Sequence, residues 1–461
     1  MSDPNTGYDV VILGGGSGGY ATALRAGQLG LTVALIEKDK VGGTCLHRGC
    51  IPTKALLHAG EVADSARESE QFGVQAELKG IDMPGVNKYK DTIVSRLYKG
   101  LTGMIKGNDK ITVLNGTGKL VGPNTVDVDG DQVTGKNIVL ATGSYAKTLP
   151  GLDIDGERIL TSDEALNLDK LPQSAIVLGG GVIGAEFASA WKSLGVDVTI
   201  VEALPRLVAA EDPDSSKALE RAFRKRGIKS HVGKPFQTVD KTANGVKLTI
   251  EGGTEVEGEI LLVAVGRGPT TSGCGFEDQG ITLDRGFVPT NEFMQTNVSH
   301  IYAVGDIVPG VQLAHRGFGH GILVAEHIAG LNPAPIDEDG IPRVTYTEPE
   351  IASVGISEAK AKETYGDKVK VYNYNLGGNG KSQILKTAGF VKLVSVEEGP
   401  IVGIHMVGTR IGEQVGEAQL IYNWEAFASD VAQLIHMHPT QNESLGEAHL
   451  ALAGKPLHAH G

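Results

Sequence analysis

Two of the chain's three cysteines, Cys45 and Cys50, are separated by four residues in a glycine-rich segment that spans residues 42–54. Proline is favoured in the first turn of a helix, so Pro52 predicts a helix that begins beside the pair. The positive end of a helix dipole stabilises a thiolate and lowers the pKa of a nearby thiol. A close pair in this setting can form a small disulfide ring, and we expect it to be oxidised and reduced reversibly.

The spacing alone leaves two other interpretations of the pair open, a structural disulfide and a metal clip. A metal clip prefers two residues between its cysteines and needs further ligands, whereas the third cysteine, Cys274, lies far along the chain. Three cysteines in 461 residues suit a reducing compartment, where an adjacent pair is more often catalytic than structural. We therefore favour a redox-active disulfide.

A glycine-rich turn ahead of the cysteines has the GxGxxG spacing of a dinucleotide site, with Gly14, Gly16 and Gly19. A strand, a helix and a strand are predicted around it at residues 8–13, 20–29 and 31–36. The first glycine makes the turn, the second admits a pyrophosphate against the backbone, and the third lets helix and strand pack closely. Glu37 ends the second strand, where a carboxylate can accept hydrogen bonds from ribose hydroxyls. Dinucleotide binding is therefore a stronger interpretation than a structural turn.

The same unit occurs again, with Gly179, Gly181 and Gly184 in the turn and Glu202 at the end of its second strand. Its strand, helix and strand are predicted at residues 174–178, 185–194 and 196–201. A carboxylate at this strand end binds a free 2′-hydroxyl and repels a 2′-phosphate, so NAD is favoured over NADP. Arg206 weakens this preference, since an arginine can bind a 2′-phosphate.

Two dinucleotide sites and one dithiol in a single chain predict an electron relay, with a flavin beside the disulfide and a nicotinamide in the second site. The length suggests about three domains. The formal charge of −13 argues against nucleic acid and against an anionic membrane surface as partners. The sequence contains no apolar run of about 18 residues, so we expect no transmembrane helix. Residues 1–8 lack the pattern of a signal peptide.

The chain resembles the FAD-dependent pyridine nucleotide-disulfide oxidoreductases over essentially its whole length. The matching motifs are residues 14–19 with Glu37, 43–45, 50–54, 141–143, 179–184 with Glu186, 264–267, 303–306, and 438–440 with Glu443. The resemblance implies an α/β fold with two Rossmann-like dinucleotide-binding domains and a C-terminal α+β dimerisation domain.

The implied domains follow one another along the chain. They are the first part of an FAD-binding domain at residues 1–150, an NAD-binding domain at 151–273, a central segment completing the FAD domain at 274–342, and a dimerisation or interface domain at 343–461. A turn-rich link at residues 148–151 and a proline-rich link at 332–342 support two of these boundaries.

The resemblance also implies roles around the cysteines. Cys50 is expected nearest the flavin, as the thiolate, and Cys45 as the thiol that exchanges with the substrate. Lys54 is expected to reach the flavin ring, with Glu186 as its partner. From the residues alone, Lys54 is equally an exposed lysine and Glu186 a surface charge on a helix.

The cofactor contacts are implied by the same resemblance. For FAD they are Gly14, Gly16, Gly19, Glu37, Thr44, Lys54, Gly118, Thr142, Gly143, Asp306 and Ala314. For NAD they are Gly179, Gly181, Val182, Ile183, Gly184, Glu202 and Gly266. Asp306 could instead cap the helix that follows it.

His438 is the expected acid–base group, because a histidine titrates near neutral pH and can take a proton from a thiol. Glu443 is expected to orient its imidazole. Considered without the resemblance, His436 and His438 could also be metal ligands or ordinary loop histidines; we expect no metal site. In the family this histidine comes from the opposite subunit, so the resemblance implies a homodimer.

The resemblance is greatest to members that oxidise protein-bound dihydrolipoamide to lipoamide and reduce NAD. It implies a partner, the lipoyl domain of an acyltransferase in a 2-oxo acid dehydrogenase complex, and we expect a cytoplasmic location. One alternative is a glutathione- or mycothione-type disulfide reductase; Glu202 opposes the glutathione type, which usually binds a 2′-phosphate. The other is a mainly structural subunit of a complex, which the complete set of Cys45, Cys50, His438 and Glu443 opposes.

Three residues, at two places in the chain, depart from the family pattern. His47 and Arg48 stand between the cysteines where the family commonly has Asn-Val, and His320 stands where acidic residues are common. We expect Arg48 to stabilise the thiolates.

Overall fold

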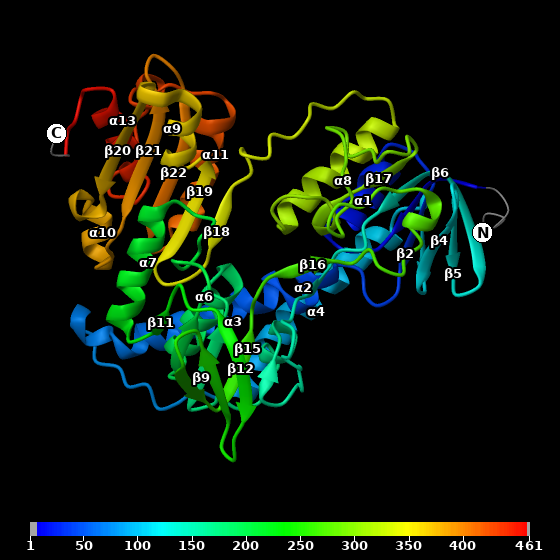
Figure 1. The fold of residues 1–461 in the computed structure, drawn as a ribbon. Helices are drawn as coiled ribbons and strands as arrows, with labels where there is room; N and C mark the ends of the chain where they lie inside the picture. Colours follow the sequence, from blue (N-terminus) through cyan, green and yellow to red (C-terminus); the bar gives the residue numbers. More distant parts are fainter. Residues whose placement is uncertain (1–6, 459–461) are drawn as a thin grey trace.

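The computed structural model describes residues 7–458, which form three units, each built on a sheet (Figure 1). Two units contain parallel sheets, and the third, drawn in yellow, orange and red, contains an antiparallel sheet. This mixed architecture is the fold class that the sequence predicts. Residues 1–6, most of the segment in which we saw no signal peptide, lie outside the described part of the chain.

The first unit is a parallel sheet in the order β3-β2-β1-β6, with β17 on the other edge of β6 and an antiparallel meander β4-β5-β6 beside it. Val10, Val11 and Ile12 of the central β1 are fully buried, as expected of a parallel strand covered on both faces. The strands are β1 (Tyr8–Leu13), β2 (Val33–Glu37), β3 (Ile111–Asn115), β4 (Gly118–Gly122), β5 (Thr125–Val128), β6 (Asp131–Leu140) and β17 (Ile301–Ala303).

The second unit is a parallel sheet in the order β11-β10-β9-β15-β8, with a separate antiparallel meander β12-β13-β14. A short antiparallel ribbon of β7 and β16 joins it to the first unit. The strands are β7 (Ser144–Ala146), β8 (Ile159–Leu160), β9 (Ser174–Leu178), β10 (Asp197–Val201), β11 (Lys229–His231), β12 (Phe236–Lys241), β13 (Val246–Ile250), β14 (Thr254–Gly258), β15 (Ile260–Val263) and β16 (Arg267–Pro269).

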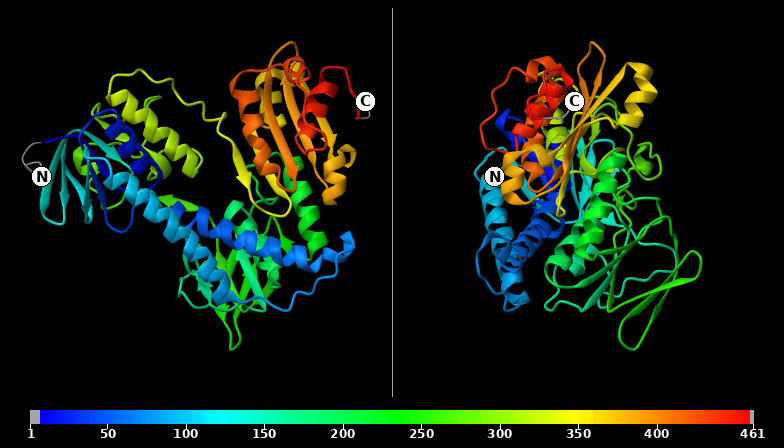
Figure 2. Two further views of the ribbon diagram at one scale, coloured as in Figure 1. Left: turned by 180° about the vertical axis from the view of Figure 1, so that it is seen from behind. Right: turned by 90° about the vertical axis from the view of Figure 1, so that its left-hand side faces the viewer.

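The third unit is an antiparallel sheet in the order β18-β19-β22-β21-β20. Its strands are β18 (Arg343–Thr345), β19 (Glu350–Gly355), β20 (Val369–Asn375), β21 (Phe390–Val396) and β22 (Ile401–Gly408). All eight residues of β22 are buried, because this strand is central and helices cover the sheet (Figure 2).

The helices position the loops of interest. Their bounds are α1 (Ser17–Gln28), α2 (Gly43–Arg48), α3 (Cys50–Arg67), α4 (Met83–Lys106), α5 (Ser162–Ala165), α6 (Val182–Ser193), α7 (Pro213–Arg226), α8 (Ala314–Ile328), α9 (Glu358–Tyr365), α10 (Gly380–Leu385), α11 (Val415–Asn423), α12 (Ala428–Val431) and α13 (Glu443–Leu452). The long helices α3 and α4 extend from the first unit to the second, where Lys90 of α4 donates to the carbonyl oxygen of Leu166 at 2.9 Å.

Residues 301–328 return to the first unit after the second unit is complete (Figure 1). Helix α8 packs directly on α1 in this return. A Cβ atom on Gly321 would lie 2.5 Å from the carbonyl oxygen of Gly18, so the close approach requires glycine.

The predicted elements around both glycine turns are confirmed, with shifted ends. The strands at residues 8–13 and 174–178 match the prediction, and helices α1 and α6 begin three residues earlier than predicted. The helix after the cysteines begins at Cys50 itself, not after Pro52, and a helical turn that we did not predict, α2, contains Cys45. Within the described residues, no helix is both long and apolar enough to cross a membrane.

Candidate active site

The first glycine turn has the backbone that a dinucleotide loop needs. Gly14 has φ +109°, which favours glycine, and a Cβ on Gly19 would lie 1.8 Å from the carbonyl oxygen of Gly14. A Cβ on Gly16 would come no nearer than 4.0 Å to the Cα atom of Gly43, so space remains in front of it. No side chain caps the N-terminus of α1, which leaves its first N–H groups available to a phosphate.

The second glycine turn repeats this geometry closely. Gly179 also has φ +109°, and a Cβ on Gly184 would lie 1.9 Å from the carbonyl oxygen of Gly179. A Cβ on Gly181 would meet no heavy atom within 4 Å, and no side chain caps α6. Both turns therefore fit a pyrophosphate at a helix N-terminus.

The two strand-end glutamates occupy equivalent positions. Glu37 accepts hydrogen bonds from the N–H groups of Gly15 at 2.7 Å and Asp39 at 2.8 Å. Glu202 accepts from Gly180 at 2.5 Å and Leu204 at 2.7 Å. Each carboxylate is thus held against its glycine turn and keeps lone pairs for ribose hydroxyls.

Arg206 is turned away from a role in binding a 2′-phosphate. Its guanidinium donates to the carbonyl oxygens of Ala209 at 2.7 Å and Glu211 at 3.3 Å, within its own loop. This geometry removes the main argument for NADP that the sequence offered.

The cysteine segment packs directly on the first glycine turn. The N–H of Gly42 donates to the carbonyl oxygen of Gly15 at 2.8 Å, and a Cβ on Gly43 would lie 2.7 Å from the Cα atom of Gly16. Helix α2 therefore begins at the dinucleotide loop, with Thr44 in its first turn. Thr53 donates its hydroxyl hydrogen to the carbonyl oxygen of Gly49 at 2.6 Å, which fixes the bend between α2 and α3.

Cys45 and Cys50 are brought together as two free, half-buried thiols. The hydrogen bond from Cys45 to the Cys50 sulfur lowers the pKa of Cys50 to about 7 against the opposing effect of burial, and the charge of Lys54 makes a smaller contribution in the same direction. The same hydrogen bond, with burial and the charge on Cys50, raises the pKa of Cys45. The two cysteines are therefore unequal, and Cys50 is the one poised as a thiolate.

Lys54 lies one turn into α3 and forms an ion pair with Glu186 of α6. Its Nζ atom is 2.7 Å from Oε2 and 3.0 Å from Oε1 of this carboxylate, whose side chain is 4% exposed. Burial lowers the pKa of Lys54, but the charge and hydrogen bond of Glu186 oppose this effect and the net pKa is raised. The Lys54 ammonium also lies 4.7 Å from the ring centroid of Tyr346.

Two expected FAD contacts lie in residues 301–328, the segment that returns to the first unit: Asp306 before α8 and Ala314 at its N-terminus. Asp306 accepts a hydrogen bond from the Ser144 hydroxyl, and Arg267 donates to that hydroxyl oxygen at 2.7 Å. Ala314 is the first residue of α8, whose N-terminus carries no side-chain cap. The hydroxyl of Thr142 donates to the carbonyl oxygen of Thr270, so β7 and β16 are tied together beside this region.

The remaining expected glycine contacts fall into two kinds. Gly143 and Gly266 have φ of +74° and +101°, and a Cβ on either would meet nothing within 4 Å. Gly118 is the first residue of β4, where a Cβ would lie 2.3 Å from Leu13 Cδ1, so its close packing requires glycine. Val182 and Ile183 form the first turn of α6, where Val182 is 40% exposed.

The two departures from the family pattern have clear surroundings. Arg48 forms an ion pair with Asp39 at 3.1 Å, so its guanidinium has a carboxylate partner and the structure gives no support to a role in stabilising the thiolates. His320 is fully buried, accepts the N–H of Gly305 at 3.3 Å and lies 3.4 Å from Glu338. Burial lowers the pKa of His320 although Glu338 opposes this.

His438 and Glu443 are adjacent but do not reach the cysteines of the same chain. His438 Nδ1 lies 2.9 Å from Glu443 Oε1, and the histidine side chain is 79% exposed. Glu443 begins α13, which lies well apart from α2 (Figure 1). The imidazole is therefore oriented by a carboxylate and presented outward.

A second pair of a histidine and a carboxylate, His436 and Glu417, fixes the loop that carries His438. His436 Nε2 lies 2.8 Å from Glu417 Oε1, and Glu417 also accepts from the side-chain amide of Asn442. The Glu417 hydrogen bond raises the pKa of His436 against the effect of burial. Among the described residues, no group of three or more His, Cys, Asp or Glu side chains could hold a metal ion.

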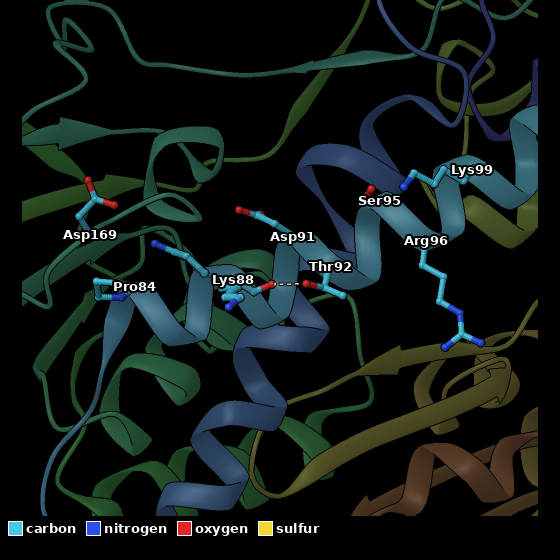
Figure 3. A pocket seen from close by; sticks show the side chains of 9 residues that line it. Pro84, Lys88, Asp91, Thr92, Ser95, Arg96, Lys99 and Asp169 are labelled. Atoms are coloured by element: carbon cyan, nitrogen blue, oxygen red, sulfur yellow. Dashed lines mark hydrogen bonds between the residues drawn. The ribbon is translucent and has the colours of Figure 1, made fainter.

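A large hollow on the surface lies apart from these residues. It is a groove of about 810 Å³ along α4, facing the loop that contains Asp169 (Figure 3). It is lined by Pro84, Asn87, Lys88, Asp91, Thr92, Ser95, Arg96, Lys99 and Asp169. Because neither a cysteine nor a glycine turn lines this groove, we do not assign the redox chemistry to it.

The comparison with known families agrees with this geometry. Residues 8–321 match the family described as pyridine nucleotide-disulphide oxidoreductase, and residues 341–449 match its dimerisation domain. The chain belongs to the pyridine nucleotide-disulphide oxidoreductase family. The second match includes both His438 and Glu443.

Relatives in this family are similar over nearly the full length of the chain. A dihydrolipoyl dehydrogenase of Bacillus subtilis is 42% identical, covering 98% of this chain and 99% of its own length. The mitochondrial dihydrolipoyl dehydrogenase of Pisum sativum is 40% identical, covering 99% of this chain and 93% of its own. The crystal structure of LpdA from Mycobacterium tuberculosis has a TM-score of 0.90 at 28% identity, covering 96% of this chain and 99% of that one.

The sequence did not indicate two tyrosines that the fold places at the site. The ring of Tyr346 lies against the Lys54 ammonium. Tyr20 lies near the cysteines: burial, and then the charges of Cys45 and Cys50, raise the pKa of Tyr20 to about 12. The spacing of neither tyrosine gives a signal, since each approaches the site only through tertiary packing.

Proposed function

We propose that this protein oxidises dihydrolipoamide to lipoamide and transfers the two electrons, through FAD, to NAD. The overall reaction is dihydrolipoamide plus NAD⁺ giving lipoamide, NADH and a proton. The observation that carries the proposal is the packing of the cysteine pair on the first dinucleotide turn, together with the Lys54–Glu186 contact that joins it to the helix of the second. Full-length similarity to dihydrolipoyl dehydrogenases supports the choice of substrate.

The residues that would hold the cofactors are those of the two glycine turns, together with residues of the segments around them. For FAD they are Gly14, Gly16, Gly19, Glu37, Thr44, Gly118, Thr142, Gly143, Asp306 and Ala314, with Lys54 beside the ring; for NAD they are Gly179, Gly181, Val182, Ile183, Gly184, Glu202 and Gly266. The open space in front of Gly16 and Gly181 and the uncapped helices fit these groups. Bound FAD would supply two-electron chemistry between a dithiol and a nicotinamide.

The cysteines would act in thiol–disulfide exchange. In the oxidised protein, a substrate thiolate attacks the Cys45 sulfur, the Cys45–Cys50 bond breaks, and Cys50 leaves as a thiolate. The second substrate thiol then attacks the mixed disulfide, which releases lipoamide and the Cys45 thiol. The lowered pKa of Cys50 and the raised pKa of Cys45 favour this division of roles.

Lys54 would keep a positive charge beside the cysteine centre. Its partner Glu186 is buried on α6, so neither group is free to leave the other without a large desolvation cost. The pair thereby fixes an ammonium where Cys50 carries negative charge.

His438 would take the proton from the substrate thiol, oriented by Glu443, and we propose that it does so in a homodimer at the cysteines of the other subunit. Its exposure and its separation from α2 support this arrangement. Around it, Leu434, Ile435 and Met437 are 60%, 98% and 71% exposed, an apolar surface of the kind that a second subunit covers.

The finer assignments belong to the same proposal. We propose domain boundaries at residues 150, 273 and 342, a cytoplasmic location, and a lipoyl domain of a 2-oxo acid dehydrogenase acyltransferase as the macromolecular partner. The matched dimerisation domain and the relatives named as dihydrolipoyl dehydrogenases support the assembly.

The proposal is tested with the purified holoprotein by following NADH formation from dihydrolipoamide and NAD. Parallel assays replace dihydrolipoamide with reduced glutathione and NAD with NADP. We expect a yellow protein active with the first pair and much less active with either replacement. A colourless protein, or one that prefers glutathione or NADP, would contradict the proposal.

A further inference from the structure

Tyr346 lies in the bend between β18 and β19 of the third unit and contacts both members of the Lys54–Glu186 pair. Its ring centroid is 4.7 Å from the Lys54 ammonium, and its backbone N–H donates to Glu186 Oε1 at 2.9 Å. The three residues come from α3, α6 and the bend after β18, which meet near the middle of the molecule (Figure 1). None of the roles assigned above includes this tyrosine.

The bend that carries Tyr346 is fixed to α6 at two points. Besides the bond to Glu186, the N–H of Glu348 donates to the hydroxyl oxygen of Ser189 at 3.0 Å. Residues 186 and 189 are neighbours on one face of a helix, so these bonds set the position of the whole bend. The ring of Tyr346 is therefore held in place by backbone contacts that a side-chain substitution leaves intact.

We propose that Tyr346 is a positioning residue that confines the Lys54 ammonium between its aromatic ring and the Glu186 carboxylate, and so keeps this charge beside Cys50. The inference rests on the proposed function, since it assigns a role in the cysteine centre. Through Tyr346, the C-terminal unit contacts the redox centre of its own chain. The same unit would also supply His438 to the redox centre of the other chain.

The physical reason is the flexibility of lysine. Its long side chain has many rotamers, and about a third of the Lys54 side-chain surface is exposed, so one carboxylate leaves several positions open to the ammonium. A cation is attracted to the face of an aromatic ring, and the attraction is stronger when water is excluded. The ring covers one side of the ammonium while Glu186 bonds the other.

The charged groups around this arrangement are few. Cys50 is affected by Cys45, Lys54 and Glu186, and Tyr346 faces Lys54, Glu350, Glu186 and Glu413. Of the groups that act on Cys50, Lys54 is the one that the ring contacts, and it can change position on the Glu186 carboxylate without leaving it; Glu186 is buried and keeps its bond from the backbone N–H of Tyr346.

The test uses the holoprotein in a Cys45→Ser background, which leaves Cys50 as the one thiol of the pair with a hydroxyl beside it. Tyr346→Leu removes the ring, Tyr346→Phe keeps it, and Tyr365→Leu is a matched control at a tyrosine of similar exposure in the same unit. Two quantities, each measured as a function of pH, report on Cys50. One is the long-wavelength charge-transfer absorbance from its thiolate to the flavin, and the other is the rate at which iodoacetamide alkylates Cys50.

We expect Tyr346→Leu to raise the midpoint of both titrations by about half a pH unit, the equivalent of one exposed cation–π contact. Tyr346→Phe and Tyr365→Leu should match the background. An unchanged midpoint in Tyr346→Leu, or an equal shift in Tyr346→Phe, would overturn the proposal. Neither readout uses a lipoyl substrate, so a failure of the proposed function and a failure of this inference can be told apart.

Discussion

A pair of glycine substitutions in the second turn separates a residue needed for the fold from one needed for the ligand. Gly184→Ala places a methyl group 1.9 Å from the carbonyl oxygen of Gly179, far inside the 3.0 Å that real Cβ atoms keep. Gly181→Ala meets no heavy atom within 4 Å, and its φ of −72° and ψ of −174° suit any residue. The two variants add the same group three residues apart.

The magnitudes follow from these surroundings. Gly184→Ala forces α6 away from the strand and should lower the free energy of unfolding by about 1–3 kcal/mol or more, as overpacking does. Gly181→Ala should leave this free energy within about 0.5 kcal/mol of wild type, because no strain is introduced. Its methyl group occupies the space in front of the turn, so NAD should bind more weakly by about 1–3 kcal/mol, a factor of roughly 5 to 150.

Chemical denaturation followed by circular dichroism gives the stability, and isothermal titration gives the dissociation constant of NAD. Gly16→Ala is the matched variant in the first turn, where retention of flavin replaces NAD affinity as the readout. The reasoning is refuted if Gly181→Ala binds NAD as tightly as wild type, or if Gly184→Ala is as stable as Gly181→Ala.

Three further outcomes are expected. His438→Gln should lower kcat by a factor of about 10² to 10⁴ with little change in the thermal midpoint, because the side chain is exposed and the loss is of acid–base catalysis; an equal loss of stability would contradict this. The Cys50 thiolate should be present above a pH of about 7 and become protonated as the pH falls through that value, since its pKa is lowered to about 7. The stability that this thiolate contributes is fully present above the ordinary pKa of a thiol and is lost as the pH falls from there through about 7; a thiolate absorbance that persists well below pH 6 would contradict the lowered pKa. Ile435→Asp should dissociate a homodimer and abolish activity while the monomer stays folded, measured by light scattering and circular dichroism, whereas an active dimer of this variant would argue against the apolar surface as the interface.

Spacing along the chain was enough to predict both glycine turns and the strand-end glutamates. A GxGxxG turn between a strand and a helix has a backbone path that its own residues determine, because each glycine stands where a side chain would clash with nearby atoms or with the ligand. The structure shows this directly, with equal φ at Gly14 and Gly179 and near-equal contacts at Gly19 and Gly184. The cysteine pair was predictable for the same reason, although α3 begins at Cys50 and not after Pro52.

Charge partners at long range were not predictable from the residues themselves. The sequence made Arg48 a candidate to stabilise the thiolates because it stands between the cysteines, yet its guanidinium bonds Asp39. Lys54 and Glu186 are 132 residues apart, and only the family resemblance suggested their pairing before the structure showed it.

The sequence by itself determined the local chemistry: two glycine turns that suit a phosphate, two strand-end acids that suit a ribose, a dithiol and a histidine followed by a glutamate. Tertiary structure decided which of these meet. It packed Gly43 on Gly16, placed Tyr346 over Lys54, and left His438 exposed and apart from α2. The reason is that short-range backbone geometry depends on neighbouring residue types, whereas contacts between distant segments depend on how helices and sheets bury their apolar faces.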